Sequence, residues 1–287
     1  MTETVHCVWP GRAQLGEGPL WSTEHRALLF VDIRGSRLLV HYPQDGATHA
    51  WPLEEACCWL VPHAQGGFVA GLRSRIVRME LDIDGPRIVE TLAHPVAGRS
   101  GQRLNDGKAD PSGRLWFGTM DDAEQEANGG FYRFDRRGLS EVDTGYGVPN
   151  GPAIDASGTT LYHTNSPTCT VYAFDLTATG QLANKRAHLR FDPSHEGHPD
   201  GMTLDAEGGL WVAHWDGGCI SRFLPDGTLD RRISLPASRV TSCAFGDDDF
   251  ATLYITTASV GRDAEPQAGA LFAVRPGVVG RAPCHYV

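Results

Sequence analysis

The tripeptide Leu115-Trp116-Phe117 decides the fold of this 287-residue chain, because close variants of it recur along the whole sequence. Each copy places a short apolar run at the start of a predicted strand. The copies are Leu29-Phe30-Val31, Gly67-Phe68-Val69, Leu115-Trp116-Phe117, Leu161-Tyr162-His163, Leu210-Trp211-Val212 and Leu253-Tyr254-Ile255. Their aromatic residues stand at 30, 68, 116, 162, 211 and 254, so the intervals are 38, 48, 46, 49 and 43 residues. Strand repeats of this period are typical of β-propellers.

Four strands per repeat are expected. We call the recurring tripeptides anchors. A second alternating strand follows each anchor, a third follows in most repeats, and one strand leads into each anchor. The last repeat is short after Val274, whereas Val5 to Trp9 has no partner in its own repeat. We therefore predict an all-β, six-bladed β-propeller of four-stranded blades, closed by the N-terminal strand, with residues 1–287 as a single domain. Two stacked β-sandwiches would not produce the nearly equal spacing.

Composition excludes several classes of partner. Lys and Arg number 25 against 35 Asp and Glu, a formal charge of −10, so we expect no nucleic-acid partner. The chain has no basic segment followed by an apolar one and no apolar window of about 18 residues. Seven cysteines without Cys-x-x-Cys spacing favour reduced thiols over disulfides or a thiolate zinc site. We expect a cytoplasmic monomer with no membrane partner.

The first strand of each blade lines the central channel of a propeller, so equivalent positions on these strands form a ring. Counting back 11 to 13 residues from each anchor finds a polar residue in four blades and a small one in the other two. These positions are Glu17, Asn105, Asn150 and Asp200, with Cys57 and Ser242 or Cys243 in the remaining blades.

Carboxylate and amide oxygens together are the ligand set that hard divalent cations prefer. The ring therefore predicts a divalent metal site. Each dipeptide alone, such as Asn150-Gly151 or Asp200-Gly201, is also an ordinary turn former. In four blades such a polar residue stands at nearly the same distance from the anchor, and this agreement favours the metal interpretation.

Other chemistries find less support. His195-Glu-Gly-His198 lacks the His-Glu-x-x-His spacing of a zincin, although a contribution from His198 stays open. No Gly-x-Ser-x-Gly elbow and no phosphate-cradling loop occurs. Cys57-Cys58 precedes an apolar strand, so we expect buried packing rather than a nucleophile, and its role in the site also stays open.

Several longer motifs resemble the senescence marker protein/gluconolactonase/luciferin-regenerating enzyme (regucalcin-like) family, and within it the bacterial sugar lactonases such as xylonolactonase. The motifs are Leu15-Gly-Glu-Gly-Pro-Leu-Trp21, the segment from Arg103 to Met120, Asn150-Gly-Pro152, Tyr172-Ala-Phe-Asp175 and Pro199-Asp-Gly-Met202. The resemblance implies a six-bladed propeller that holds one divalent ion through Glu17, Asn150 and Asp200. It favours calcium and leaves Fe²⁺, Zn²⁺, Mn²⁺ and Mg²⁺ open.

The resemblance also implies substrate contacts and a reaction. Arg103 and Asn105 match family residues that touch the sugar, and Asp122 is the counterpart of a substrate-contacting glutamate that is one methylene longer. The expected reaction is metal-dependent hydrolysis of a sugar (aldono-)lactone. The metal would polarise the carbonyl and Asp200 would activate water as general base. A calcium-dependent phosphotriesterase and a non-catalytic calcium-binding propeller are the alternatives.

Overall fold

The computed structural model describes residues 4–287, and nearly all regular structure in this range is β. Its tertiary contacts divide the chain into two compact units. Unit 1 comprises the described residues up to Ala56 together with Phe191–Ala282, and unit 2 comprises Cys57–Arg190 with Pro283–Val287. The single domain over 1–287 stays a prediction.

Unit 1 contains three four-stranded antiparallel sheets and a short helix, α1 (Pro193–Glu196). The first sheet has β2 (Gly16–Ser22), β3 (Ala27–Asp32), β4 (Arg37–Tyr42) and β5 (Ala47–Pro52). The second has β18 (His198–Leu204), β19 (Leu210–Trp215), β20 (Cys219–Phe223) and β21 (Leu229–Ser234). The third has β22 (Val240–Gly246), β23 (Thr252–Thr257), β24 (Leu271–Val274) and β1 (His6–Trp9).

The N-terminal strand closes that third sheet. β1 pairs antiparallel with β24, and His6 lies opposite Ala273. The closure predicted from Val5 to Trp9 is therefore confirmed, because the start of the chain supplies the fourth strand that its end lacks.

Unit 2 contains the other three sheets and a 3₁₀ turn, η1 (Ser166–Thr168). The first sheet has β6 (Cys57–Pro62), β7 (Phe68–Leu72), β8 (Ile76–Asp82) and β9 (Gly85–Ala93). The second has β10 (Gln102–Ala109), β11 (Leu115–Asp121), β12 (Gly129–Asp135) and β13 (Gly138–Tyr146). The third has β14 (Pro149–Ile154), β15 (Thr160–Asn165), β16 (Thr170–Leu176) and β17 (Leu182–Arg190).

These six four-stranded sheets are the blades of a six-bladed β-propeller, as predicted. The aromatic residue of each anchor tripeptide lies on the second strand of its blade, and β3 and β7 are buried along their whole length. The fourth strands β9 and β17 are mostly exposed and carry charged residues. Charged outer strands discourage edge-to-edge pairing with other chains.

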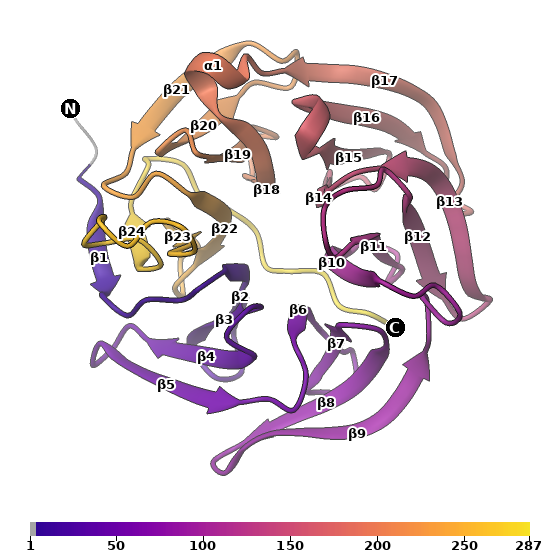
Figure 1. The fold of residues 1–287 in the computed structure, drawn as a ribbon, viewed down its shortest axis with the longest axis horizontal. Helices are drawn as coiled ribbons and strands as arrows, with labels where there is room; N and C mark the ends of the chain where they lie inside the picture. Colours follow the sequence, from indigo (N-terminus) through magenta and orange to yellow (C-terminus); the bar gives the residue numbers. More distant parts are fainter. Residues whose placement is uncertain (1–3) are drawn as a thin grey trace. The chain divides into compact units, whose positions relative to one another are not determined.

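Within each unit, the first strands of neighbouring blades contact one another: β2 and β18 both contact β22, and β6 and β14 both contact β10 (Figure 1). Every first strand also has a break in its pairing register with the second strand. The breaks fall at Glu17/Leu20, Cys57/Trp59, Leu104/Gly107, Asn150/Ala153, Pro199/Met202 and Val240/Ser242. Such bulges redirect side chains at functional positions. A register break thus occurs at or beside the predicted ring position in all six blades.

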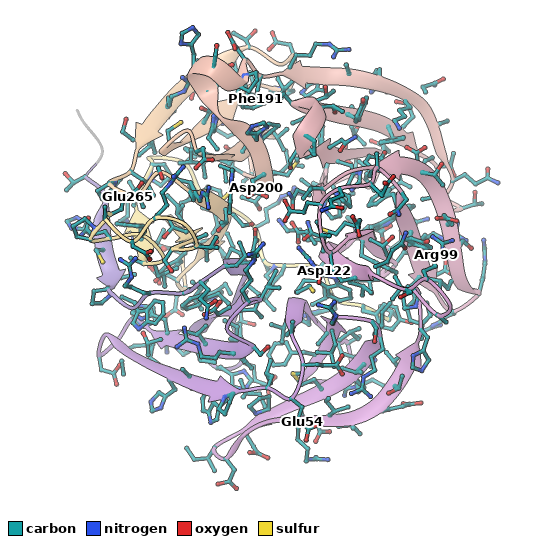
Figure 2. All side chains as sticks on the ribbon, in the orientation of Figure 1. Glu54, Arg99, Asp122, Phe191, Asp200 and Glu265 are labelled. Carbon is teal, nitrogen blue, oxygen red and sulfur yellow. The ribbon has the colours of Figure 1, made fainter. Side chains whose placement is uncertain are left out.

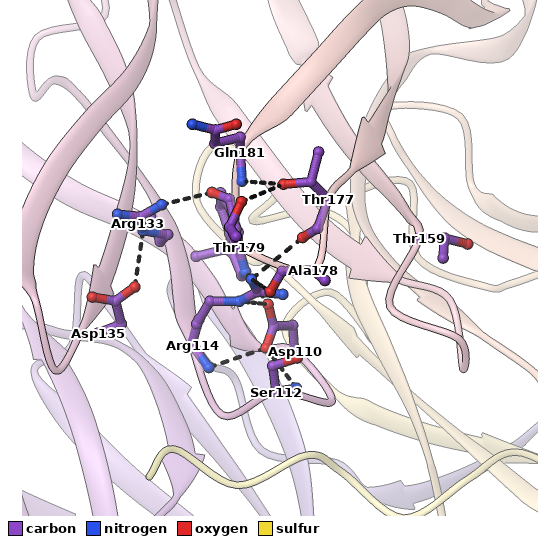
Figure 3. A network of polar contacts seen from close by, with 12 residues as sticks. Asp110, Ser112, Arg114, Arg133, Asp135, Thr159, Thr177, Ala178, Thr179 and Gln181 are labelled. Carbon is purple, nitrogen blue, oxygen red and sulfur yellow. Dashed lines mark hydrogen bonds and ion pairs between the residues drawn. The ribbon is translucent and has the colours of Figure 1, made fainter.

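A buried aspartate braces the second strand in one blade of each unit. In unit 2, Asp110 Oδ2 accepts hydrogen bonds from Trp116 Nε1 at 2.8 Å and from Arg114 Nε at 2.6 Å (Figure 3). Arg114 then reaches the next blade through the carbonyl oxygen of Ala178, at 3.1 Å. In unit 1, Asp205 Oδ2 binds Trp211 Nε1 at 2.9 Å and Arg222 Nε at 2.7 Å. The aspartate therefore fixes the anchor tryptophan.

All seven cysteines are free thiols, and five of them are buried. Cys57 Sγ donates to the Trp59 carbonyl oxygen at 3.5 Å, and Cys58 Sγ to that of Leu104 at 3.1 Å. The expectation of buried packing for this pair is confirmed. Among the residues described, no helix is long and apolar enough to cross a membrane.

Two histidines are buried in their neutral form. His163 stacks on Phe131, with ring centroids 3.7 Å apart, and within residues 4–287 neither of its ring nitrogens has a hydrogen-bond partner. Burial, aided by the charge of Lys185, lowers the pKa of His163 well below 6.5. In unit 1, burial lowers the pKa of His214 to about 4.

Acid should destabilise the fold through these groups. As the pH falls below 6.5, His163 and His214 become protonated in the unfolded chain but stay neutral in the folded chain. The free energy of unfolding therefore falls as the pH is lowered. We expect His163→Phe to lose less stability than the parent between about pH 7 and pH 5, measured by urea unfolding. His49→Phe, at an exposed histidine, is the control. Equal losses in His163→Phe and the parent would contradict this expectation.

Candidate active site

Unit 1 supplies two buried carboxylates on first strands. The exposed fractions of Glu17 and Asp200 are 7% and 5%, and their strands β2 and β18 both contact β22. Glu17 Oε2 accepts a hydrogen bond from the Gly18 backbone N–H at 3.0 Å. A Cβ atom at Gly201 would lie 2.3 Å from Ser242 Oγ, so β18 approaches β22 this closely only with glycine after Asp200. Figure 2 shows Asp200 on the inner strand of its blade.

Unit 2 brings together the other four predicted site residues. Asn105 Nδ2 donates to Asn150 Oδ1 at 2.8 Å, and Arg103 Nη1 donates to Asn105 Oδ1 at 2.7 Å. Arg103 Nε lies 2.9 Å from Asp122 Oδ1. Arg103, Asn105 and Asn150 are buried, whereas about a third of the Asp122 side chain is exposed beside β10 (Figure 2). One polar network therefore links the predicted sugar contacts to the predicted metal ligand Asn150.

Arg73 joins this network, although the sequence analysis did not single it out. Its Nη2 atom lies 2.7 Å from Asp122 Oδ2, so both oxygens of Asp122 hold a guanidinium group. Ser166 is a second such residue, because its Oγ accepts from Asn150 Nδ2 at 2.9 Å.

The antiparallel register explains both additions. The start of each first strand pairs with the end of the second, as Cys57 does with Leu72 and Pro149 with Asn165. Residues directly after a second strand therefore lie at the same end of the blade as the start of the first strand, which carries the predicted site residues. The same rule would have found Arg73 and Ser166 from their positions just past the anchor strands.

Asp106 is a buried acid within this segment. Burial raises its pKa to about 6, partly opposed by Lys108 and by the backbone N–H groups of Gly107 and Gly151. Its Oδ1 accepts from Gly107 N at 2.7 Å, while Oδ2 has no hydrogen-bond partner in the described part of the chain. Asp106 thus lies on β10 against the start of β14, where Gly151 follows Asn150.

In unit 1, the end of β19 and the start of β18 follow the same rule. Trp215, at the end of β19, pairs with His198 at the start of β18. Arg239 lies over the Trp215 ring at 4.5 Å and also bonds Asp216 Oδ1 through Nε at 2.9 Å. His195 is exposed in α1, while His198 is only partly buried. The indole therefore has a fixed position on the face where β18 begins.

The predicted ligands offer only oxygen donors, the kind that hard divalent cations prefer. Unit 1 supplies the buried carboxylates of Glu17 and Asp200, and unit 2 supplies the buried amide oxygen of Asn150. No group of three or more His, Cys, Asp or Glu side chains suited to a metal occurs among residues 4–287. Metal binding by Glu17, Asn150 and Asp200 therefore stays a prediction.

The profile of the SMP-30/Gluconolactonase/LRE-like region matches residues 15–259. The chain belongs to this family. It is 36% identical to a 6-deoxy-6-sulfogluconolactonase of Pseudomonas putida over 98% of both chains. It is also 36% identical to a pentonolactonase of Haloferax volcanii, over 93% of this chain and 88% of the relative. A calcium-binding protein, regucalcin, from Agrobacterium tumefaciens superposes with a TM-score of 0.90 at 25% identity, covering 100% and 98% of the two chains. The predicted family is confirmed.

Proposed function

We propose that this family member is a sugar lactonase, which hydrolyses an aldonolactone to the aldonic acid. Water adds to the ester carbonyl, the ring C–O bond breaks, and a carboxylate and a free hydroxyl result. The observation that carries the proposal is the polar network of unit 2, with the buried side chains of Arg103, Asn105 and Asn150. Two relatives, each 36% identical to this chain, are named as sugar lactonases.

The proposal includes one divalent ion held by Glu17, Asn150 and Asp200, with calcium favoured. Support comes from the oxygen-only donor set and from the similarity to a calcium-binding regucalcin. When bound, such an ion supplies Lewis-acid polarisation of the lactone carbonyl.

The protein's own groups have distinct tasks in this proposal. Asp200 is the general base that takes a proton from the attacking water. Arg103 orients the sugar, because its contacts within residues 4–287 use Nε and Nη1 and leave the two N–H groups of Nη2. Asp122, with both oxygens against guanidinium groups, presents its remaining lone pairs to sugar hydroxyls. Direct contact of Asn105 with the sugar and a cytoplasmic, monomeric state stay predictions.

Substrate preference tests the proposal. A site built to bond hydroxyls rejects analogues that lack them, because its polar groups are then left unpaired. We expect a pentonolactone to be hydrolysed with at least about a hundredfold higher kcat/KM than unsubstituted γ-butyrolactone. Arg103→Ala should narrow this gap mainly by slowing the sugar substrate, whereas Arg26→Ala, at an exposed ion pair, should not.

A panel of lactones and one phosphotriester, followed by proton release, gives the readout. Similar efficiencies on the two lactones would favour a general esterase. Hydrolysis of the phosphotriester alone would favour the phosphotriesterase alternative, and no turnover of any substrate would favour a binding protein.

A further inference from the structure

Four buried or half-buried side chains of unit 2 form one continuous hydrogen-bonded chain. Arg103 Nη1 donates to Asn105 Oδ1 at 2.7 Å, and Asn105 Nδ2 donates to Asn150 Oδ1 at 2.8 Å. Asn150 Nδ2 then donates to Ser166 Oγ at 2.9 Å. The chain starts on β10, crosses to β14 and ends at η1. It therefore ties two neighbouring blades together at their first strands.

The direction of every bond in this chain follows from its first member. A guanidinium group only donates, so Asn105 must turn its oxygen toward Arg103. The amide nitrogen of Asn105 then faces the Pro149 carbonyl oxygen at 2.7 Å, and that oxygen can only accept. Both neighbours thus select the same orientation, and both N–H groups of Asn105 are used.

The orientation passes on to Asn150. Because Asn105 offers an N–H group, Asn150 must meet it with its own oxygen, since two amide nitrogens cannot bond each other. Its nitrogen consequently faces Ser166. An amide oxygen is a ligand for hard cations, whereas an amide nitrogen is not. The atom that Asn150 presents therefore decides whether it can serve as a ligand.

We infer that Arg103 and Ser166 are positioning residues which, with Asn105 between them, hold the Asn150 amide with its oxygen available for the ion. This inference rests on the proposed metal site. In this inference Asn105 orients the Asn150 amide in addition to contacting the sugar. Ser166, at the start of the 3₁₀ turn, orients the same amide.

Asn105→Asp tests the inference by the sign of its effect. The carboxylate keeps the bond from Arg103 but offers Asn150 only acceptors, so Asn150 turns its nitrogen toward Asp and its oxygen toward the Ser166 hydroxyl, which can donate. Added negative charge alone would tighten cation binding. The inference instead predicts binding of Ca²⁺ weakened at least about tenfold, as for other groups that orient metal ligands.

Isothermal titration of the parent and the variants with Ca²⁺ alone measures this. Asn128→Asp, which adds the same charge at an exposed position of unit 2, should bind like the parent. Ser166→Ala should weaken binding and Ser166→Thr should retain it, because only the hydroxyl matters; this pair is informative even where Asn105→Asp fails to fold.

Parent-like or tighter binding by Asn105→Asp, or parent-like binding by Ser166→Ala, overturns the inference. A parent chain that binds no divalent ion overturns the metal site and the inference with it, whereas lactone turnover tests the proposed reaction separately.

Discussion

Asp200→Asn is expected to lower the turnover of a pentonolactone by at least about a hundredfold, the low end of what a general base contributes. The amide keeps an oxygen but cannot take a proton from water at neutral pH. It also removes one negative charge from the proposed ligand set, so the affinity for Ca²⁺ should fall.

Initial rates at saturating lactone, with Ca²⁺ raised until they no longer increase, separate the two effects. Asp248→Asn is the matched control, because this exposed carboxylate pairs with exposed Arg26 in the same unit. Nearly parental turnover in a folded, ion-saturated Asp200→Asn chain would remove Asp200 from the mechanism.

The largest effect on stability is expected at Asp205, which is fully buried. Its Oδ1 accepts from the Glu207 and Gly209 backbone N–H groups at 3.0 and 2.8 Å, and its Oδ2 binds Trp211 and Arg222. Asp205→Ala leaves a buried guanidinium and an indole N–H without this carboxylate. Removing one partner of a buried ion pair costs about 3–5 kcal/mol. Because Arg222 keeps its ion pairs with Glu207 and Asp230, we expect a loss in the free energy of unfolding near the lower end of this range.

Urea unfolding of Asp205→Ala beside Asp155→Ala measures this difference. Asp155 accepts from Ser157 and Thr159 in the corresponding turn of its own blade, but within the described part of the chain it binds neither an arginine nor a tryptophan. The Asp155→Ala loss should therefore be clearly smaller. Equal losses would show that the contacts to Trp211 and Arg222 contribute little.

The blade pattern could be predicted from the sequence because burial recurs with the repeat. Anchors such as Trp116 and Trp211 must be apolar to fill the space between neighbouring blades, and both are fully buried. The missing fourth strand after Val274 left one place for the N-terminal segment, and β1 occupies it. The blade pattern and the closure by the N-terminal strand both follow from the spacing of the anchors and from the need of each strand for a pairing partner.

The local geometry of the site could not be predicted in the same way. Asn150-Gly151 and Asp200-Gly201 are equally compatible with turns, yet they lie within strands at register breaks. The hydrogen-bond directions from Arg103 to Ser166 depend on contacts between blades, which no single motif encodes. Arg73 was missed because no motif marks it; only its position directly after β7, where it pairs with Asp122, indicates its role.

Hydrolysis of a pentonolactone before and after removal of bound ions tests the account most directly. We expect chelation to abolish proton release and Ca²⁺ to restore it, while the circular dichroism of the β-sheets stays unchanged, because the blades bury their core independently of one ion. Full activity in the chelated, ion-free protein would contradict the account.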